Sequence, residues 1–178
     1  MEEVARGLLR CGRPFLLVVC RDGLQDDGGG GGGGDIAGIQ QSQQGMVVDW
    51  CDQLEVLTHP AVGCFVSYCG WNSTVEAVAA GVPVVAVLNT LDQTTNAYLV
   101  EEAWGVGVRA EMNGEGVLTG VELERCIELV MGRGAKAMDI RERAKALKEM
   151  ARQAADAGGA AERNLQQFLN TVVQPLLQ

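Results

Sequence analysis

The sequence predicts an α/β fold built on a doubly wound parallel sheet with helices on both faces. Short apolar runs alternate along the chain with segments whose apolar residues recur at helical spacing. The runs are continuously apolar, which is typical of strands buried in a parallel sheet. The 178 residues, 47% of them hydrophobic, suffice for one buried core and are too few for two ordinary domains.

The first part of the chain predicts a helix over 4–10, an apolar strand over 15–20 and a short strand over 46–48. Seven consecutive glycines lie within a segment, 22–35, whose composition predicts a flexible surface loop. A phosphate-binding glycine loop is the less favoured alternative, because such loops run directly from a strand into a helix and often carry a lysine.

The middle of the chain repeats a strand–helix unit. A short helix or turn is expected over 51–57, a strand over 62–68 and a helix over 74–80. That helix should end at Gly81, since glycine readily adopts the left-handed conformation of a helix C-terminus. A fully apolar strand follows over 84–88.

The last unit consists of a polar loop over 89–95, a helix over 96–104 and a strand over 105–109. Thr119 and Glu122 have the spacing of a capping box that opens a helix. The C-terminal helices are expected over about 119–177, as 119–131, 135–157 and 160–177.

Charge and cysteine usage exclude several classes of function. The net charge of −9 would repel nucleic acid or an acidic membrane surface, so a phosphate ligand must be held by local geometry. Alternatively, this charge merely keeps the protein dispersed. No apolar run could span a membrane and no signal peptide is recognisable. The six cysteines are Cys11, Cys20, Cys51, Cys64, Cys69 and Cys126. Their spacing does not match a metal site, and most lie among apolar residues, which predicts small buried side chains. Unpaired thiols of this kind are typical of a reducing compartment such as the cytosol.

Three polar clusters follow predicted strands, at the edge where parallel sheets bind ligands: 50–53, 69–76 and Asp92–Gln93. In the middle cluster a strand turns through Gly70 into a helix, whose free N–H groups and dipole suit a diphosphate. The alternative is that Ser73 and Glu76 form a capping box and bind nothing.

The stretch WCDQLEVLTHPAVGCFVSYCGWNSTVE, running on from Trp50 to Asp92-Gln93 over 44 residues, resembles the plant secondary-product glycosyltransferase signature. Both flanks are similar to the same family, the plant family 1 UDP-dependent glycosyltransferases. The resemblance implies that 1–178 is a single UDP-sugar-binding domain, the Rossmann-like C-terminal half of a GT-B enzyme. The N-terminal acceptor domain has no counterpart in this sequence.

The resemblance also implies a role for each site residue. The Trp50 ring would stack on uracil while Gln53 helps to fix the nucleoside. Glu76 would accept hydrogen bonds from the ribose hydroxyls. Asn72 and Ser73 would contact the diphosphate, with Tyr68 facing it, and Asp92 and Gln93 would bind the sugar hydroxyls. Trp71 is also expected to be a substrate-binding residue.

Two departures from the family pattern affect the donor site. Tyr68 stands where the family has a histidine, which removes a positive charge from the diphosphate and should weaken donor binding. Residues 88–91 replace the Pro-x-aromatic-x run that the family usually has before Asp92 and Gln93, which alters the pocket that selects the sugar. Gln93 nevertheless resembles the residue usually found with UDP-glucose.

By resemblance the function is the inverting transfer of a sugar, glucose, from a UDP-sugar to a hydroxyl or carboxyl of a small plant metabolite such as a flavonoid. The family's catalytic histidine belongs to the N-terminal domain, and His59 is expected to be structural, so no catalytic residue, metal or cofactor is expected here. A small-molecule acceptor would bind only with that domain present. The alternative is a non-catalytic UDP-sugar-binding module or a decayed fragment. A dehydrogenase is disfavoured because no G-x-G-x-x-G follows a strand.

Overall fold

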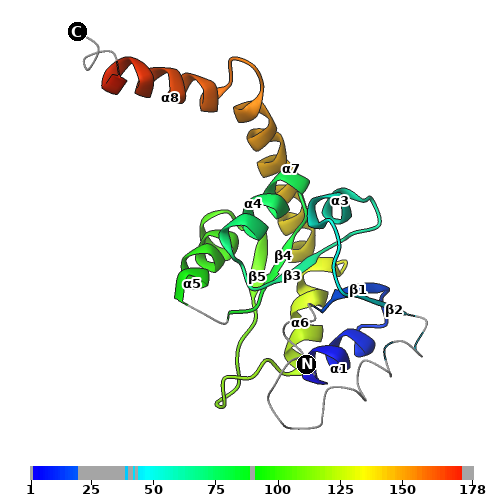
Figure 1. Cartoon of the computed structure of the whole chain (residues 1–178). Coiled ribbons are helices and arrows are strands. Elements are labelled where there is room, and N and C mark those ends of the chain that lie inside the picture. The colour runs from blue at the N-terminus through cyan, green and yellow to red at the C-terminus, as the bar shows by residue number, and fades with distance from the viewer. Residues whose placement is uncertain (1, 20–38, 40–41, 43, 89–90, 174–178) are drawn as a thin grey trace.

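The computed structural model describes residues 2–19, 39, 42, 44–88 and 91–173. Its strands form two parallel sheets (Figure 1). The first sheet contains β1 (Phe15–Val18) and β2 (Gly45–Val48). The second has the order β3 (Phe65–Ser67), β4 (Val84–Ala86) and β5 (Gly107–Arg109).

Helices join and cover these strands. Before and between the strands lie α1 (Glu2–Arg10), α3 (Gln53–Thr58), α4 (Trp71–Ala80), and α5 (Leu91–Tyr98) with its π-helical continuation η2 (Leu99–Ala103). After β5 come α6 (Gly120–Met131), α7 (Ala135–Ala155), and α8 (Ala160–Phe168) with the π-helical η3 (Leu169–Val173).

The central strand β4 is covered on both faces. Successive strand residues point to opposite sides of a sheet. Val85 packs in one buried cluster with Leu123 and other residues of α6, whereas its neighbours Val84 and Ala86 pack with residues of α4, α5 and η2 in a second cluster. The prediction of an α/β fold with parallel strands and helices on both faces is therefore confirmed, although the strands form two sheets in place of one.

The glycines at two turning points have structural reasons. Gly81 ends α4 in the left-handed conformation, with φ of 69°, as the sequence predicts. Gly107 lies where β5 approaches β4 so closely that a Cβ atom would be 2.1 Å from the carbonyl oxygen of Val84. No other residue fits at Gly107 without moving the strand.

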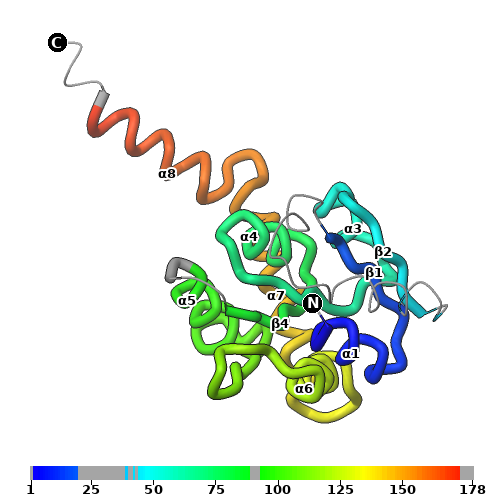
Figure 2. Tube along the Cα trace, turned by 60° about the horizontal axis from the view of Figure 1, so that its bottom comes forward, coloured from blue at the N-terminus to red at the C-terminus, as the bar shows by residue number. Residues whose placement is uncertain are grey.

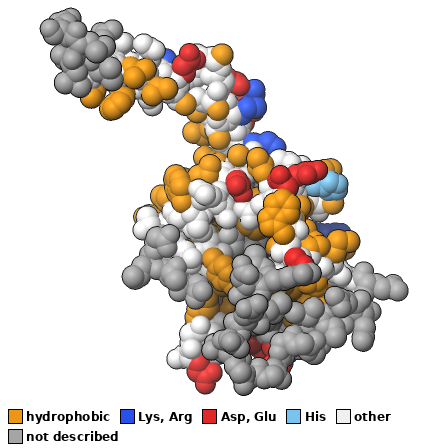
Figure 3. Space-filling view, in the orientation of Figure 1, with side chains coloured by type: hydrophobic (Ala, Val, Ile, Leu, Met, Phe, Trp, Pro, Cys, Tyr) orange, Lys and Arg blue, Asp and Glu red, His pale blue; other side chains and the backbone are white. Residues whose placement is uncertain are grey.

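The C-terminal helices begin within one residue of the expected positions, and the expected continuation of the last helix over 174–177 lies outside the described residues. Thr119 caps α6 by accepting a hydrogen bond from the backbone N–H of Glu122. Beyond α7, α8 leads away from the rest of the molecule (Figures 1 and 2) and contains no buried residue. Hydrophobic side chains gather along one side of this projecting helix in Figure 3. Leu165 and Phe168 of α8 are both more than half exposed.

Candidate donor site

The predicted site residues all lie after the carboxyl ends of strands. Trp50 and Gln53 follow β2, the segment from Tyr68 to Glu76 follows β3, and Asp92–Gln93 follow β4. In an open parallel sheet these ends meet at one edge, where ligands bind. The glycine-rich segment 22–35 lies outside the described residues.

The first turn of α4 carries the middle cluster. The helix begins at Trp71, three residues earlier than the sequence suggests, so Asn72 and Ser73 lie in its first turn. Its N-cap is Gly70, which offers no side-chain hydrogen bond to the helix. The first amides of a helix have no intrahelical partner. They and the positive end of the helix dipole are therefore left for a ligand, and an anion is the best match.

Gln53 brings α3 and α4 together at this point. Its side-chain amide nitrogen donates to the Ser73 hydroxyl at 3.1 Å and to a carboxylate oxygen of Glu76 at 2.5 Å. Asp52 fixes the start of α3, because its carboxylate accepts from the backbone N–H of Glu55 at 2.9 Å. Gln53 is thereby held at the first position of α3.

These contacts exclude the capping-box alternative for Ser73 and Glu76. Ser73 lies inside α4 and the cap is Gly70, so Ser73 has no capping role. The hydroxyl and the carboxylate instead receive hydrogen bonds from another helix. Sequence spacing alone could not separate the two cases, because a helix start three residues further along would give the same motif.

Three aromatic side chains near this cluster are exposed. Trp50 is 74% exposed, Tyr68 57% and Trp71 56%. Large aromatic rings are usually mostly buried in a folded protein. Flat exposed rings beside a hydrogen-bonding cluster provide surfaces on which a planar base can stack.

Asp92 and Gln93 differ from expectation in their local structure. The sequence predicts a loop over 89–95, but α5 already begins at Leu91, so both residues lie in its first turn. Polar residues are compatible with a first turn, and an acidic one complements the helix dipole. Residues 89 and 90 lie outside the described part of the chain.

The sequence predicts a helix that starts at Asn96 and assigns this residue no role in the site. In the structure Asn96 is 7% exposed, and its side-chain amide donates to the backbone carbonyl of Cys69 at 2.9 Å. This bond ties α5 to the turn between β3 and α4. The one sequence signal for this contact was a polar residue next to the apolar Ala97, since an amide that is buried there requires a hydrogen-bond partner.

Two buried thiols and the histidine have structural surroundings. Burial raises the pKa of the Cys69 thiol to about 11 and that of Cys64 to about 12, so both stay neutral. His59 ends α3, and its Nδ1 accepts from the backbone N–H of Ala61 at 3.2 Å, which is the structural role expected of it. Within the described ranges no group of residues could hold a metal ion. No helix there is apolar over a long enough stretch to cross a bilayer.

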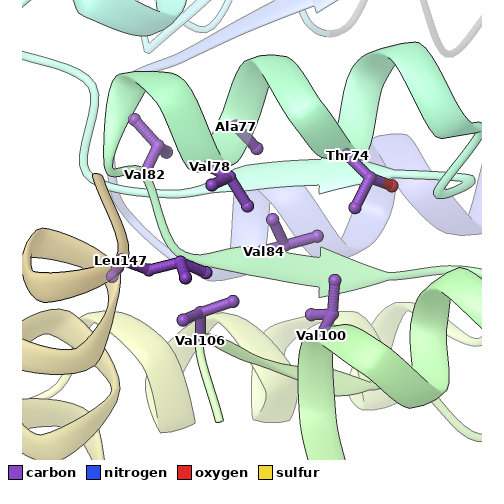
Figure 4. Close-up of a pocket in the computed structure, with 9 residues that line it drawn as sticks. Thr74, Ala77, Val78, Val82, Val84, Val100, Val106 and Leu147 are labelled. Atoms are coloured by element: carbon purple, nitrogen blue, oxygen red, sulfur yellow. The ribbon is translucent and has the colours of Figure 1, made fainter. Parts of the chain in front are cut away.

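One enclosed space among the described residues belongs to the core. Figure 4 shows apolar side chains of α4, β4, α7 and the residue before β5 pointing toward one another, including Val78, Val84, Val106 and Leu147. The space between them holds no water-sized void. It is a helix-packing contact, so the candidate site is the open face at the strand ends.

Comparison with known proteins supports the family resemblance. Residues 39–138, more than half of the chain, match the family model described as UDP-glucoronosyl and UDP-glucosyl transferase. The anthocyanidin 3-O-glucoside 5-O-glucosyltransferase 1 of Perilla frutescens is 49% identical over 98% of this chain. The phloretin 4'-O-glucosyltransferase of Malus domestica is 45% identical over 97%.

Solved structures share the fold. Os79 from O. sativa, in complex with UDP and deoxynivalenol-3-glucoside, superposes with a TM-score of 0.84 at 40% identity and covers 94% of this chain. UGT2 from Phytolacca americana, complexed with UDP-2fluoro-glucose and pterostilbene, gives a TM-score of 0.81 at 27% identity. The chain spans 38% of the length of the Perilla relative and 37% of Os79.

Proposed function

Because the chain belongs to the UDP-glucoronosyl and UDP-glucosyl transferase family, we propose that the face formed by α3, the first turn of α4 and the start of α5 binds a UDP-sugar. The observation that carries the proposal is the pair of hydrogen bonds from Gln53 to Ser73 and Glu76. They hold a carboxylate and a hydroxyl beside the uncapped N-terminus of α4. The Glu76 carboxylate suits a diol, and the N-terminus of α4 suits a diphosphate.

Each part of the donor has a matching group. Uracil stacks on the exposed ring of Trp50, and the ribose hydroxyls donate to Glu76, with Gln53 beside them. The diphosphate accepts from the first-turn amides and side chains of α4, at Trp71, Asn72 and Ser73, with Tyr68 facing it. Asp92 and Gln93 bind the sugar hydroxyls, which a carboxylate and an amide complement.

The reaction we propose for the full-length enzyme is transfer of the sugar, glucose, to a hydroxyl or carboxyl of a small plant metabolite. The acceptor oxygen attacks the anomeric carbon opposite the departing UDP, which inverts that carbon, and a hydroxyl acceptor gives its proton to the catalytic histidine that the resemblance assigns to the N-terminal domain. As the bond between this carbon and the diphosphate breaks, negative charge grows on the leaving phosphate, and the amides of α4 stabilise it. The relatives' activities toward anthocyanidin glucosides and phloretin support the substrate class.

A second candidate function is UDP-sugar binding without catalysis by this chain. Tyr68 favours it, because a phenol carries no positive charge near neutral pH. His59 favours it as well, since the chain's one histidine serves a local turn. A cytosolic location is proposed with either function, supported by thiols that act as buried packing groups, such as Cys69 and Cys126.

Calorimetric titration with UDP, UDP-glucose and ADP tests the donor site. We expect saturable binding of both uridine ligands and much weaker binding of ADP. Glu76→Gln should weaken UDP by roughly tenfold, since a neutral amide accepts the ribose hydroxyls less strongly. Glu162→Gln, a substitution on the projecting α8, is the matched control and should leave binding unchanged. No binding of UDP by the folded chain would refute the proposal.

A further inference from the structure

The side chain of Asn96 makes a long-range contact that none of the roles above uses. It is buried on α5, and its amide nitrogen donates at 2.9 Å to the backbone carbonyl of Cys69, 27 residues earlier. A buried polar side chain is costly unless it is hydrogen-bonded. The contact therefore joins two elements that lie far apart in the sequence.

The residue that receives this bond has an unusual backbone. Cys69 has φ of 57°, which makes it the one non-glycine residue with positive φ in the described part of the chain. The left-handed region is unfavourable for a residue with a Cβ atom, and it persists only where surrounding contacts impose it. Here the Cys69 side chain is fully buried, and its N–H donates to the Ser67 hydroxyl at 3.1 Å.

The turn at Cys69 sets the direction in which α4 begins. Cys69 immediately precedes Gly70, the N-cap of that helix. The Gly70 carbonyl in turn accepts from the hydroxyl of Thr74 at 3.0 Å, one turn into the helix. A change in the Cys69 dihedral angle would redirect the first-turn amides, which are the groups assigned to the diphosphate.

The same contact fixes α5 relative to that turn. Asn96 lies one turn after Gln93 on a single helix, α5. The helix is a rigid element, so holding Asn96 against Cys69 also holds the first turn of α5 against the first turn of α4. The position of the proposed phosphate subsite relative to the proposed sugar subsite is therefore fixed.

We propose that Asn96 is a positioning residue for the donor: its amide holds Cys69 in the left-handed conformation and so aims the first-turn amides of α4 at the diphosphate. The proposal rests on the proposed function, because it concerns the same site. Asn96 itself does not touch the ligand. Its effect should therefore depend on whether the ligand carries phosphates.

The test compares the affinities of UDP and uridine for the wild type and for Asn96→Ala. Uridine presents the base and ribose without the diphosphate. We expect Asn96→Ala to weaken UDP about tenfold and uridine less than twofold. Val130→Ala, at a buried residue of α6, is the control for general destabilisation and should leave the ratio of the two affinities unchanged. Equal loss for both ligands in Asn96→Ala, or no loss, would overturn the proposal.

Two further measurements keep the test decisive. If Asn96→Ala does not fold, Asn96→Ser is used, because it keeps a donor on a smaller side chain. We expect Asn96→Ser to weaken UDP relative to uridine by less than tenfold but measurably. If the wild type does not bind UDP, the proposed function fails, and hydrogen exchange decides the positioning role at two hydrogen-bonded amides, those of Cys69 and Thr74, which donate to the Ser67 hydroxyl and the Gly70 carbonyl. Faster exchange in the Asn96 variant supports it, and unchanged exchange refutes it.

Discussion

The Gln53 side-chain nitrogen lies 2.5 Å from a carboxylate oxygen of Glu76, a residue 23 positions further along the chain. The two helices that carry them, α3 and α4, both start at strand ends, so the contact forms at the ligand-binding edge of the fold. The carboxylate is thereby oriented before any ligand arrives, which lowers the entropy cost of binding.

Gln53→Ala should weaken UDP binding about tenfold, because Glu76 loses its orienting donor and a hydrogen bond to a charged group is worth roughly 1.5 to 3 kcal/mol. Calorimetry measures the change. Gln153→Ala is a matched control, since Gln153 donates to Glu149 at 2.9 Å on the exposed surface of α7. An equal effect of both substitutions would count against a donor-binding role for Gln53.

Tyr68→His should strengthen UDP-glucose binding, by roughly tenfold at pH 6 and little at pH 8.5. Histidine titrates near pH 6.5, so its positive charge is present below that pH and is lost above it. The diphosphate of UDP-glucose is substituted at both ends and does not titrate in this range. Tyr98→His, at an exposed tyrosine of α5, is the control and should show no such pH dependence. A gain independent of pH would contradict the electrostatic explanation.

Gly70→Ala separates a ligand role from a structural one. Apart from Gly70 itself and its two chain neighbours, no described residue lies within 4 Å of a Cβ built at Gly70, and its φ of −56° suits alanine. The melting temperature should therefore change little, whereas UDP affinity should fall because the methyl group crowds the diphosphate. Gly134→Ala is the control, because Gly134 is also an uncapped glycine N-cap with open space around it, at α7. Unchanged affinity in Gly70→Ala would place the diphosphate elsewhere.

The ionisation of Glu122 should make the free energy of unfolding depend on pH in the acid range. The hydrogen bond from the Arg125 guanidinium, aided by the backbone N–H of Glu111, lowers the pKa of Glu122 from its usual 4.5 to about 2. A carboxyl with a lowered folded-state pKa contributes stability above its unfolded pKa, and that contribution is lost as pH falls from about 4.5 to about 2.

Glu122→Gln should therefore lower the free energy of unfolding by about 1 to 2 kcal/mol at pH 7 and by little at pH 2.5. Urea denaturation at several pH values measures the difference. Glu149→Gln is the comparison, because Glu149 and its partner Arg152 are both more than half exposed, and water screens that pair. A loss that is the same at pH 7 and pH 2.5 would show that the ion pair is not its cause.

The fold could be predicted from the sequence wherever burial decides the structure. The apolar runs around Phe65, Val84 and Val108 became strands, because continuous apolar segments are stable only between two covering layers. The division into two sheets could not be predicted. Hydrophobic periodicity identifies a strand but carries no information about which edges pair.

The site was predictable in its residues but less so in its geometry. The segment from Trp50 to Glu76 carried the family resemblance, and the structure brings Gln53, Ser73 and Glu76 of that segment together. The predicted starts of α4 and α5 were wrong, because the first turns of both helices contain polar residues that are equally common in loops. The bond from Asn96 to Cys69 depends on how two helices pack, which local sequence does not encode.

The two separate sheets also determine how the chain behaves in concentrated solution. Among the described strands, β1 pairs only with β2 and β3 only with β4, so each sheet presents an open edge. Leu16, Val18 and Met46 of the first sheet are 39%, 42% and 64% exposed. Apolar strands with unpaired backbone groups are templates for edge-to-edge association between molecules. Self-association should therefore begin at the sheet of β1 and β2, and a lysine in place of Val18 would oppose it by adding a charge at that edge.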